Sequence, residues 1–270
     1  MSKGTILVAV SAADRIPLAS GKLGKTGTYL NELVVPVMTA KDAGYDYVLA
    51  TPTGTKPIID EVSAAAGHFG NDEAAFEKAA AFFDNDPAMQ KPKTLKAVVA
   101  EGLENYVAVF VPGGQAPIVD MAQDEDFGKI LRYFHEHSKP TALLCHGPIA
   151  LTAALTEMKT FRKAMETGDI TAAKAAAAKG WPYTGYRMTI FTNEEEKYIE
   201  DEILHDKMQF HVVDALQAAG GLVSRSERDF QPYVVHDREL ITGQNPRSDH
   251  QLAETLLKAI ADAPSSARVA

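Results

Sequence analysis

One pattern repeats along the sequence: a short apolar run ends in turn residues and is followed by a segment with helical spacing. Four such runs occur, at residues 5–10, 45–51, 106–112 and 141–144. A continuous apolar run is typical of a strand that is covered on both faces, as in a parallel sheet. Because helical segments separate the runs, the pattern predicts one α/β layer structure with a mostly parallel sheet.

The remaining segments add helices and a hairpin to this pattern. Apolar spacing predicts a helix over Leu30 to Val37, with Thr28 as its cap and a kink or a late start at Pro36. Residues 233–241 are expected to form a hairpin. Apolar residues between 252 and 260 give a closing helix its buried face.

The 270 residues are predicted to form a single domain, 1–270, with two departures from the alternating pattern. Residues from about 56 to 96 lose the regular spacing, apart from one amphipathic helix, and are expected to leave the sheet as an excursion. An alanine-rich stretch from about 156 to 181 is helical by propensity but weakly patterned. It predicts a helical insertion that caps the functional site or lies on the surface.

Composition and charge narrow the functional classes. Hydrophobic and charged contents of 46% and 23% are ordinary for a globular protein. A net charge of −9 disfavours a nucleic-acid or anionic-membrane surface, so a small neutral or weakly charged substrate is expected. No run is long enough for a signal peptide or a membrane span. The single cysteine excludes an internal disulfide, and a cytoplasmic location is the expectation.

Cys145 lies between the apolar run 141–144 and a good helix-forming segment, 149–155, so a sharp strand-to-helix turn is predicted there. This is the geometry of a nucleophile elbow. The positive end of a helix dipole and the neighbouring His146 would both favour the reactive thiolate. A lone cysteine at the end of a strand can also be a small core side chain, but the His-Gly-Pro sequence that follows favours a function.

Two glycines and several glutamates are further candidates. Gly113 and Gly114 directly follow the run 106–112, where they allow a close backbone approach and leave N–H groups free to point at a ligand. A plain turn would also explain them. Glu32 lies in the predicted first helix, where a solvated glutamate that interacts with the helix dipole is the commoner case. The glutamates at 194–196 open an acidic helix in the same way.

Five separated segments together resemble the ThiJ/PfpI superfamily: Lys25–Glu32, Val111–Gly114, Cys145–Pro148, Thr189–Asn193 and Leu240–Pro246. More narrowly, they are similar to its branch of glutathione-independent glyoxalases (glyoxalase III) and heat-shock chaperones. The segments occur in the family order over nearly the whole chain, and only the insertion lies outside the resemblance. It implies a doubly wound, flavodoxin-like sheet of the class I glutamine amidotransferase type, with ligands at the carboxyl ends of the strands.

The resemblance also implies roles for individual residues. Cys145 would be the nucleophile, His146 the proton shuttle beside it, and Glu32 a carboxyl group that contacts the thiol. An acidic residue downstream would orient the histidine. Ungapped pairing places this residue at Glu196, and a one-residue shift places it at Glu195.

Substrate contacts are implied for Gly113, Gly114 and Gln115. Gly114 would supply an oxyanion-hole N–H, with the backbone N–H of His146 as the second donor. Much of the branch has a histidine where this chain has Gln115, so a metal site that uses that histidine is not expected here. Gln115 is free to hydrogen-bond a substrate carbonyl instead.

The function implied is that of a glyoxalase without cofactor, which converts methylglyoxal or related 2-oxoaldehydes to 2-hydroxy acids through a cysteine hemithioacetal and overlaps with a deglycase. Members of the superfamily are commonly dimers, so a homodimer is expected. Three alternatives stay open: a stress-related holding chaperone with a vestigial site, a cysteine peptidase or amidase, and a redox sensor with an oxidisable thiol.

Overall fold

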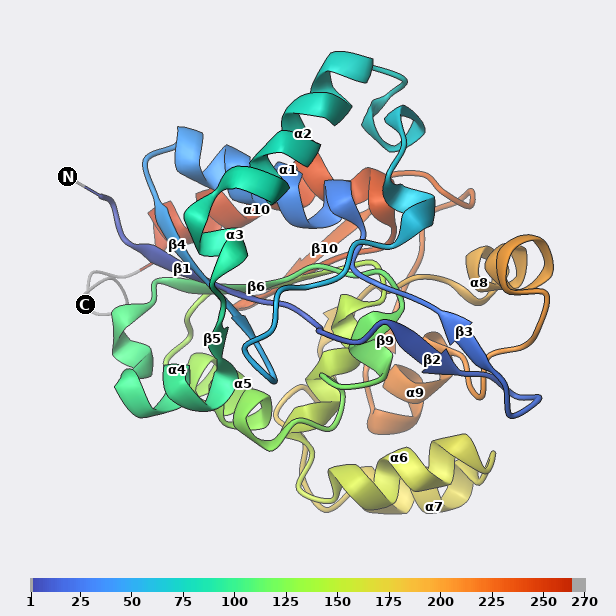
Figure 1. The fold of residues 1–270 in the computed structure, drawn as a ribbon. Coiled ribbons are helices and arrows are strands. Elements are labelled where there is room, and N and C mark those ends of the chain that lie inside the picture. Colours follow the sequence, from blue (N-terminus) through green and yellow to red (C-terminus); the bar gives the residue numbers. More distant parts are fainter. Residues whose placement is uncertain (1, 264–270) are drawn as a thin grey trace.

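The computed structural model describes residues 2–263, and these residues are built around one large sheet (Figure 1). Its seven strands follow the spatial order β10 (Val234–Asp237), β11 (Leu240–Gly243), β7 (Thr141–Leu144), β6 (Ala108–Val111), β1 (Thr5–Ala9), β4 (Asp46–Thr51) and β5 (Lys93–Thr94). All neighbouring strands are parallel except the β10–β11 hairpin. The predicted mostly parallel sheet is therefore confirmed.

The four apolar runs of the sequence each contain a strand of this sheet. β6 and β7 are buried along their whole length, and β1 is buried from Ile6 onward. Apart from the threonine that begins β1 and the one that begins β7, these central strands are apolar, because helices cover both of their faces. β1 and β6 end one residue before their apolar runs, because the last residue of each run enters the turn that follows.

Helices pack on both sides of the sheet (Figure 1). On one side lie α1 (Leu30–Asp42), α2 (Glu73–Asn85) and α10 (Asp249–Asp262), and both α2 and α10 contact α1. On the other side lie α4 (Leu95–Glu101) and α5 (Glu125–Glu136), which contact each other. This arrangement is the doubly wound, flavodoxin-like fold that the resemblance implies.

The first helix differs from its prediction in two details. The predicted cap, Thr28, is wrong: the N-cap residue is Tyr29, which makes no side-chain cap hydrogen bond. Thr28 instead forms a β-bridge with Ile59 and donates its N–H to the Ile58 carbonyl at 2.8 Å. Pro36 lies inside α1, so it does not delay the helix start.

The predicted excursion leaves the sheet after β4 and returns at β5. It contains two short 3₁₀ turns, η1 (Glu61–Ser63) and η2 (Ala66–Phe69), followed by α2 and by α3 (Pro87–Gln90). The Asp72 side chain caps α2 by accepting from the Ala75 N–H at 3.1 Å. The excursion thus adds a wall beside α1.

The alanine-rich insertion forms two helices, α6 (Met158–Glu166) and α7 (Ile170–Ala177), which contact each other. α7 also packs on α9 (Val212–Ala219), on the side of the molecule away from α1 and α2 (Figure 1). The Trp181 indole N–H attaches the end of the insertion by donating to the Leu151 carbonyl at 2.8 Å.

Two small sheets and one more helix complete the described chain. β2 (Arg15–Pro17) pairs antiparallel with β3 (Leu23–Lys25), and β8 (Arg187–Met188) pairs parallel with β9 (Leu222–Val223). α8 (Asn193–Ile199) continues into a π-helical turn, η6 (Glu200–Leu204). None of the helices in residues 2–263 is long and apolar enough to cross a membrane.

Candidate active site

A cavity of about 1290 Å³ has Gly114, Gln115, Cys145 and His146 in its lining. These four residues follow the carboxyl ends of β6 and β7, the edge at which α/β sheets of this kind bind their ligands. No residue from 156 to 181 lines the cavity. The insertion was expected either to cap the site or to lie on the surface. The structure places it on the surface, and it does not cover Cys145.

Cys145 has a positive φ of 59°, which marks the sharp turn of a nucleophile elbow. The backbone N–H of Cys145 donates to the Gly243 carbonyl at 2.8 Å, and this hydrogen bond holds the residue in place. The segment after the turn, η5 (Gly147–Ala154), is wound as a 3₁₀ helix and not as the predicted α-helix. Cys145 is only 2% exposed, but it lines the cavity and so is more than a core side chain.

Glu32 is 0% exposed and its carboxyl group faces the Cys145 thiol. The Gly113 N–H donates to Glu32 Oε2 at 2.9 Å. Burial raises the pKa of Glu32 to about 8, although the hydrogen bonds from Cys145 and Gly113 oppose that rise. The solvated first-turn glutamate is therefore excluded, and Glu32 mostly carries a proton at neutral pH.

The Cys145 thiol is also protonated in this environment. Burial raises its pKa well above the ordinary value, and once Glu32 ionises, the negative charge of its carboxylate adds to the rise. The Gly114 N–H, which is directed at the sulfur, lowers the pKa but does not outweigh these effects. The prediction of a thiolate at rest is thus wrong, because burial and an acidic neighbour dominate over the short 3₁₀ helix that follows.

His146 lies between the thiol and a buried carboxylate. Its Nδ1 is 3.3 Å from Cys145 Sγ, and its Nε2 is 2.6 Å from Glu196 Oε2. Because a carboxylate accepts at Nε2, the neutral ring carries its proton there and leaves Nδ1 as the acceptor for the thiol proton. The Phe191 ring stacks on the imidazole with centroids 4.4 Å apart and fixes its plane.

The two adjacent glutamates have separate partners. Glu196 contacts His146, whereas Glu195 forms a capping box with Thr192 at the start of α8. Glu195 Oε1 also accepts from Gln244 Nε2 and Asn245 Nδ2, both at 2.9 Å. Successive helical residues point about 100° apart, so only one of the two can face His146. The segment Leu240–Pro246 is thereby connected to α8.

The two glycines allow a close backbone approach, but they do not both offer free N–H groups. The Gly113 N–H is used by Glu32, and a Cβ at this position would lie 2.7 Å from the Leu144 carbonyl oxygen. Gly114 has a φ of 77°, and a Cβ there would lie 2.0 Å from the Gly27 oxygen. Gly114 is therefore the one whose N–H faces the sulfur and the cavity.

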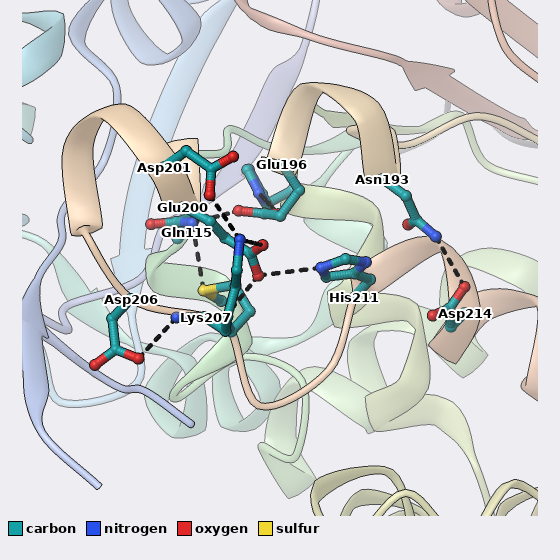
Figure 2. A network of polar contacts seen from close by, with 11 residues as sticks. Gln115, Asn193, Glu196, Glu200, Asp201, Asp206, Lys207, His211 and Asp214 are labelled. Atoms are coloured by element: carbon teal, nitrogen blue, oxygen red, sulfur yellow. Dashed lines mark hydrogen bonds and ion pairs between the residues drawn. The ribbon is translucent and has the colours of Figure 1, made fainter. Parts of the chain in front are cut away.

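Gln115 has a different partner from the one expected (Figure 2). Its Nε2 donates to Glu196 Oε1 at 2.6 Å and lies 3.5 Å from Met208 Sδ. The amide N–H groups are thus directed at the catalytic carboxylate candidate and not at a substrate carbonyl. Within residues 2–263, no three His, Cys, Asp or Glu side chains are grouped so that they could hold a metal ion.

The sequence did not indicate Glu200, which holds the segment of Met208 against Gln115. Glu200, which is buried, accepts from the Met208 N–H at 2.8 Å and from His211 and Lys207 at 3.1 Å each (Figure 2). Burial raises the pKa of Glu200, but these partners outweigh burial and hold it below the ordinary value. The sequence offers no signal for this role, because Glu200 stands in an acidic run that is typical of an exposed helix.

Comparisons with known proteins give a family match and a curated relative. The pattern that defines the DJ-1/PfpI family matches residues 23–259. The protein/nucleic acid deglycase HchA of Staphylococcus aureus (strain JH9) is 26% identical over 258 residues, covering 93% of this chain and 78% of that protein.

Two solved structures share the fold at 21% identity. Glyoxalase III of Candida albicans has a TM-score of 0.68 over 95% of this chain and 97% of its own. The Rapid Encystment Protein of Francisella tularensis has a TM-score of 0.72 over 95% and 99%. The match over residues 23–259 confirms the predicted superfamily. The chain belongs to the DJ-1/PfpI family.

Proposed function

We propose that the protein is a deglycase- or glyoxalase-type enzyme that converts methylglyoxal or related 2-oxoaldehydes to 2-hydroxy acids, with Cys145 as the nucleophile. One observation carries this proposal: Cys145 Sγ is 3.3 Å from His146 Nδ1, and His146 Nε2 is 2.6 Å from Glu196 Oε2. The similarity to the deglycase HchA supports the same class of chemistry. The reaction requires no cofactor, because the enzyme thiol itself adds to the aldehyde.

The first step is addition of sulfur to the aldehyde carbon, C1. The thiol proton passes to His146 Nδ1 as the S–C1 bond forms, and the carbonyl electron pair moves onto oxygen. The backbone N–H groups of Gly114 and His146 are the proposed donors to this alkoxide. Glu196 stabilises the imidazolium that forms, which is why a protonated resting thiol is compatible with catalysis. Proton transfer from the imidazolium to the alkoxide completes the hemithioacetal.

The second step moves a proton between the two substrate carbons. His146, neutral again, removes the C1 proton to give an enediol, and reprotonation at C2 gives the thioester of a 2-hydroxy acid. Water then attacks C1, the S–C1 bond breaks, and sulfur regains its proton. The balance is one 2-oxoaldehyde plus one water to one 2-hydroxy acid, so neither an oxidant nor a reductant is consumed.

The test is lactate formation from methylglyoxal by the purified protein without glutathione and in the presence of a metal chelator. Wild type is expected to form lactate, and Cys145→Ala and His146→Ala are expected to lose at least 10³-fold of the rate. Ile170→Ala is the matched control, because this exposed α7 side chain does not line the cavity. Lactate formation at the wild-type rate by folded Cys145→Ala protein would contradict the proposal, as would no turnover by wild type.

A further inference from the structure

A row of aromatic rings leads from His146 to the surface. Phe191 stacks on His146, Phe230 meets Phe191 edge to face with centroids 6.1 Å apart, and Tyr198 meets Phe230 at 5.7 Å. We call Phe191, Phe230 and Tyr198 the aromatic row. All three line the cavity that contains Cys145, and their exposure increases outward, from 2% at Phe191 to 53% at Tyr198.

The backbone of Phe230 is held in an uncommon conformation. Its φ of 57° is in the left-handed region, which a bulky residue adopts only when its surroundings impose it. Here the Phe230 N–H donates at 2.7 Å to Glu195 Oε1, the same buried oxygen that is bound by Gln244 and Asn245. Strain of this kind is concentrated at functional sites. A buried carboxylate is thus used to hold one aromatic ring at the cavity.

Exposed apolar side chains gather at the same cavity. Of the six well-exposed large apolar side chains in residues 2–263, three line it: Ile58 at 48%, Val62 at 37% and Tyr198 at 53%. Such side chains are costly to expose unless they meet an apolar ligand. Ile58 and Val62 belong to the excursion after β4, so the wall is assembled from segments far apart in the sequence.

The cavity is also much larger than methylglyoxal, which has five non-hydrogen atoms. Its volume of about 1290 Å³ exceeds the roughly 300–1,000 Å³ of sites that enclose drug-sized ligands. A 2-oxoaldehyde whose C1 is bonded to Cys145 has its substituent on C2. Since His146 adjoins Cys145 and carries the stacked Phe191 ring, the aromatic row begins one side chain away from the reacting sulfur.

We propose that the aromatic row, together with Ile58 and Val62, is a subsite for an aryl or extended apolar substituent on the 2-oxoaldehyde, so that aryl glyoxals are preferred over methylglyoxal. This inference rests on the proposed function and specifies its substrate class. Offset and edge-to-face ring contacts supply the recognition, and they are available to a phenyl group but not to a methyl group.

The first experiment compares kcat/KM for phenylglyoxal and methylglyoxal, measured as initial rates of mandelate and lactate formation. Wild type is expected to favour phenylglyoxal by about tenfold or more, since each added apolar group in a fitted pocket contributes at least about that factor. In Tyr198→Ala and Phe230→Ala the ratio of the two kcat/KM values is expected to fall about tenfold. Ile170→Ala, with an exposed apolar residue outside the cavity, keeps the wild-type ratio.

A second measurement does not depend on turnover of an aryl substrate. Mandelate, the expected product, should bind the wild-type protein about tenfold more tightly than lactate by calorimetry, and Tyr198→Ala should lose this difference. Tyr198 is exposed on α8, so its variant is expected to fold even where Phe230→Ala does not. Thermal unfolding of each variant verifies this.

The outcomes separate the two proposals. No turnover of either aldehyde by folded wild type overturns the proposed function, while the mandelate measurement still tests the subsite. Turnover of methylglyoxal with a phenylglyoxal preference at or below one overturns the subsite alone. A preference that both Tyr198→Ala and Phe230→Ala retain also overturns it, because the recognition then lies elsewhere in the cavity.

Discussion

Glu32 and Cys145 show how the protonation of single side chains depends on what surrounds them. Both are buried, they face each other, and both have a raised pKa. Two adjacent negative charges without water would repel each other, so a protonated pair is the stable state. In the proposed reaction, the thiol loses its proton to His146 only as sulfur adds to the substrate.

Replacing Glu32 by Gln tests this state through protein stability. The pKa of the carboxyl is 4.5 in the unfolded chain and about 8 in the folded protein. The contribution of this carboxyl to the free energy of unfolding is fully present below pH 4.5 and is lost as the pH rises through about 8. The size of the loss is about 1.4 kcal/mol for each unit by which the two pKa values differ. In Glu32→Gln this fall should flatten. Urea unfolding across that pH range measures it, with the exposed Glu227→Gln as control. An unchanged slope would contradict the raised pKa.

Gln115 is predicted to act on Glu196 and not on the substrate. Gln115→Leu leaves Glu196 Oε1 buried without this donor, which costs about 1–3 kcal/mol, so kcat should fall roughly tenfold to a hundredfold while KM changes little. Gln115→Glu, of the same shape, replaces the donor by a like charge, so its kcat should fall as pH rises and the new carboxyl ionises. Steady-state kinetics against pH measure both. A raised KM at unchanged kcat would instead indicate direct substrate contact, as the sequence suggested.

At the scale of elements, the elbow depends on how closely η5 approaches its neighbours. α5 packs on η5 at Gly128, where a Cβ would lie 2.3 Å from the Ala153 carbonyl oxygen. This is backbone and not a flexible side chain, so it cannot move aside cheaply. α5 thus fixes η5, the element that directly follows Cys145.

Gly128→Ala separates packing from helix propensity. Propensity alone would stabilise α5 by up to about 1 kcal/mol. The clash with Ala153 should instead destabilise the protein by about 1–3 kcal/mol. Urea unfolding gives the difference, and Lys129→Ala, an exposed neighbour on α5, should change stability by only a few tenths of a kcal/mol. A stabilised Gly128→Ala protein would show that α5 and η5 leave room for a Cβ at residue 128.

At the scale of the whole molecule, the two long departures from the alternating pattern have different positions. The excursion after β4 lines the cavity through Ile58, Val62 and the segment 67–72. The alanine-rich insertion contributes nothing to the lining and packs on α9. We therefore expect the excursion to set substrate size and the insertion to affect stability without affecting the site.

Trp181→Phe tests that division. The variant loses the indole N–H and leaves the Leu151 carbonyl without this partner, which should lower stability by about 1–3 kcal/mol. Since no insertion residue lines the cavity, kcat/KM for methylglyoxal should change less than about twofold. Circular dichroism during thermal unfolding and lactate formation measure the two quantities. A large loss of activity in the folded variant would mean that the insertion supports the site.

The fold class and the place of Cys145 could be predicted from the sequence because both depend on local properties. Apolar run length and helical spacing specify strands and helices, and a turn between 144 and 147 must project the side chain at its tip. The caps of helices depend also on contacts that are distant in the sequence. Thr28 is not a cap because its N–H pairs with a segment 30 residues away, which local spacing does not report.

What only the tertiary structure decided is the partner of each functional group. Glu32 and Gly113, Gln115 and Glu196, and His146 and Glu196 are separated by 81, 81 and 50 residues, and their contacts exist only once the sheet has formed. Burial then determines which groups keep their protons, since desolvation is a property of the packed site and not of the residue. By itself the sequence determined that a cysteine followed by a histidine stands at the elbow of an α/β sheet, and tertiary packing decided the protonation state of the thiol and which carboxylate contacts the histidine.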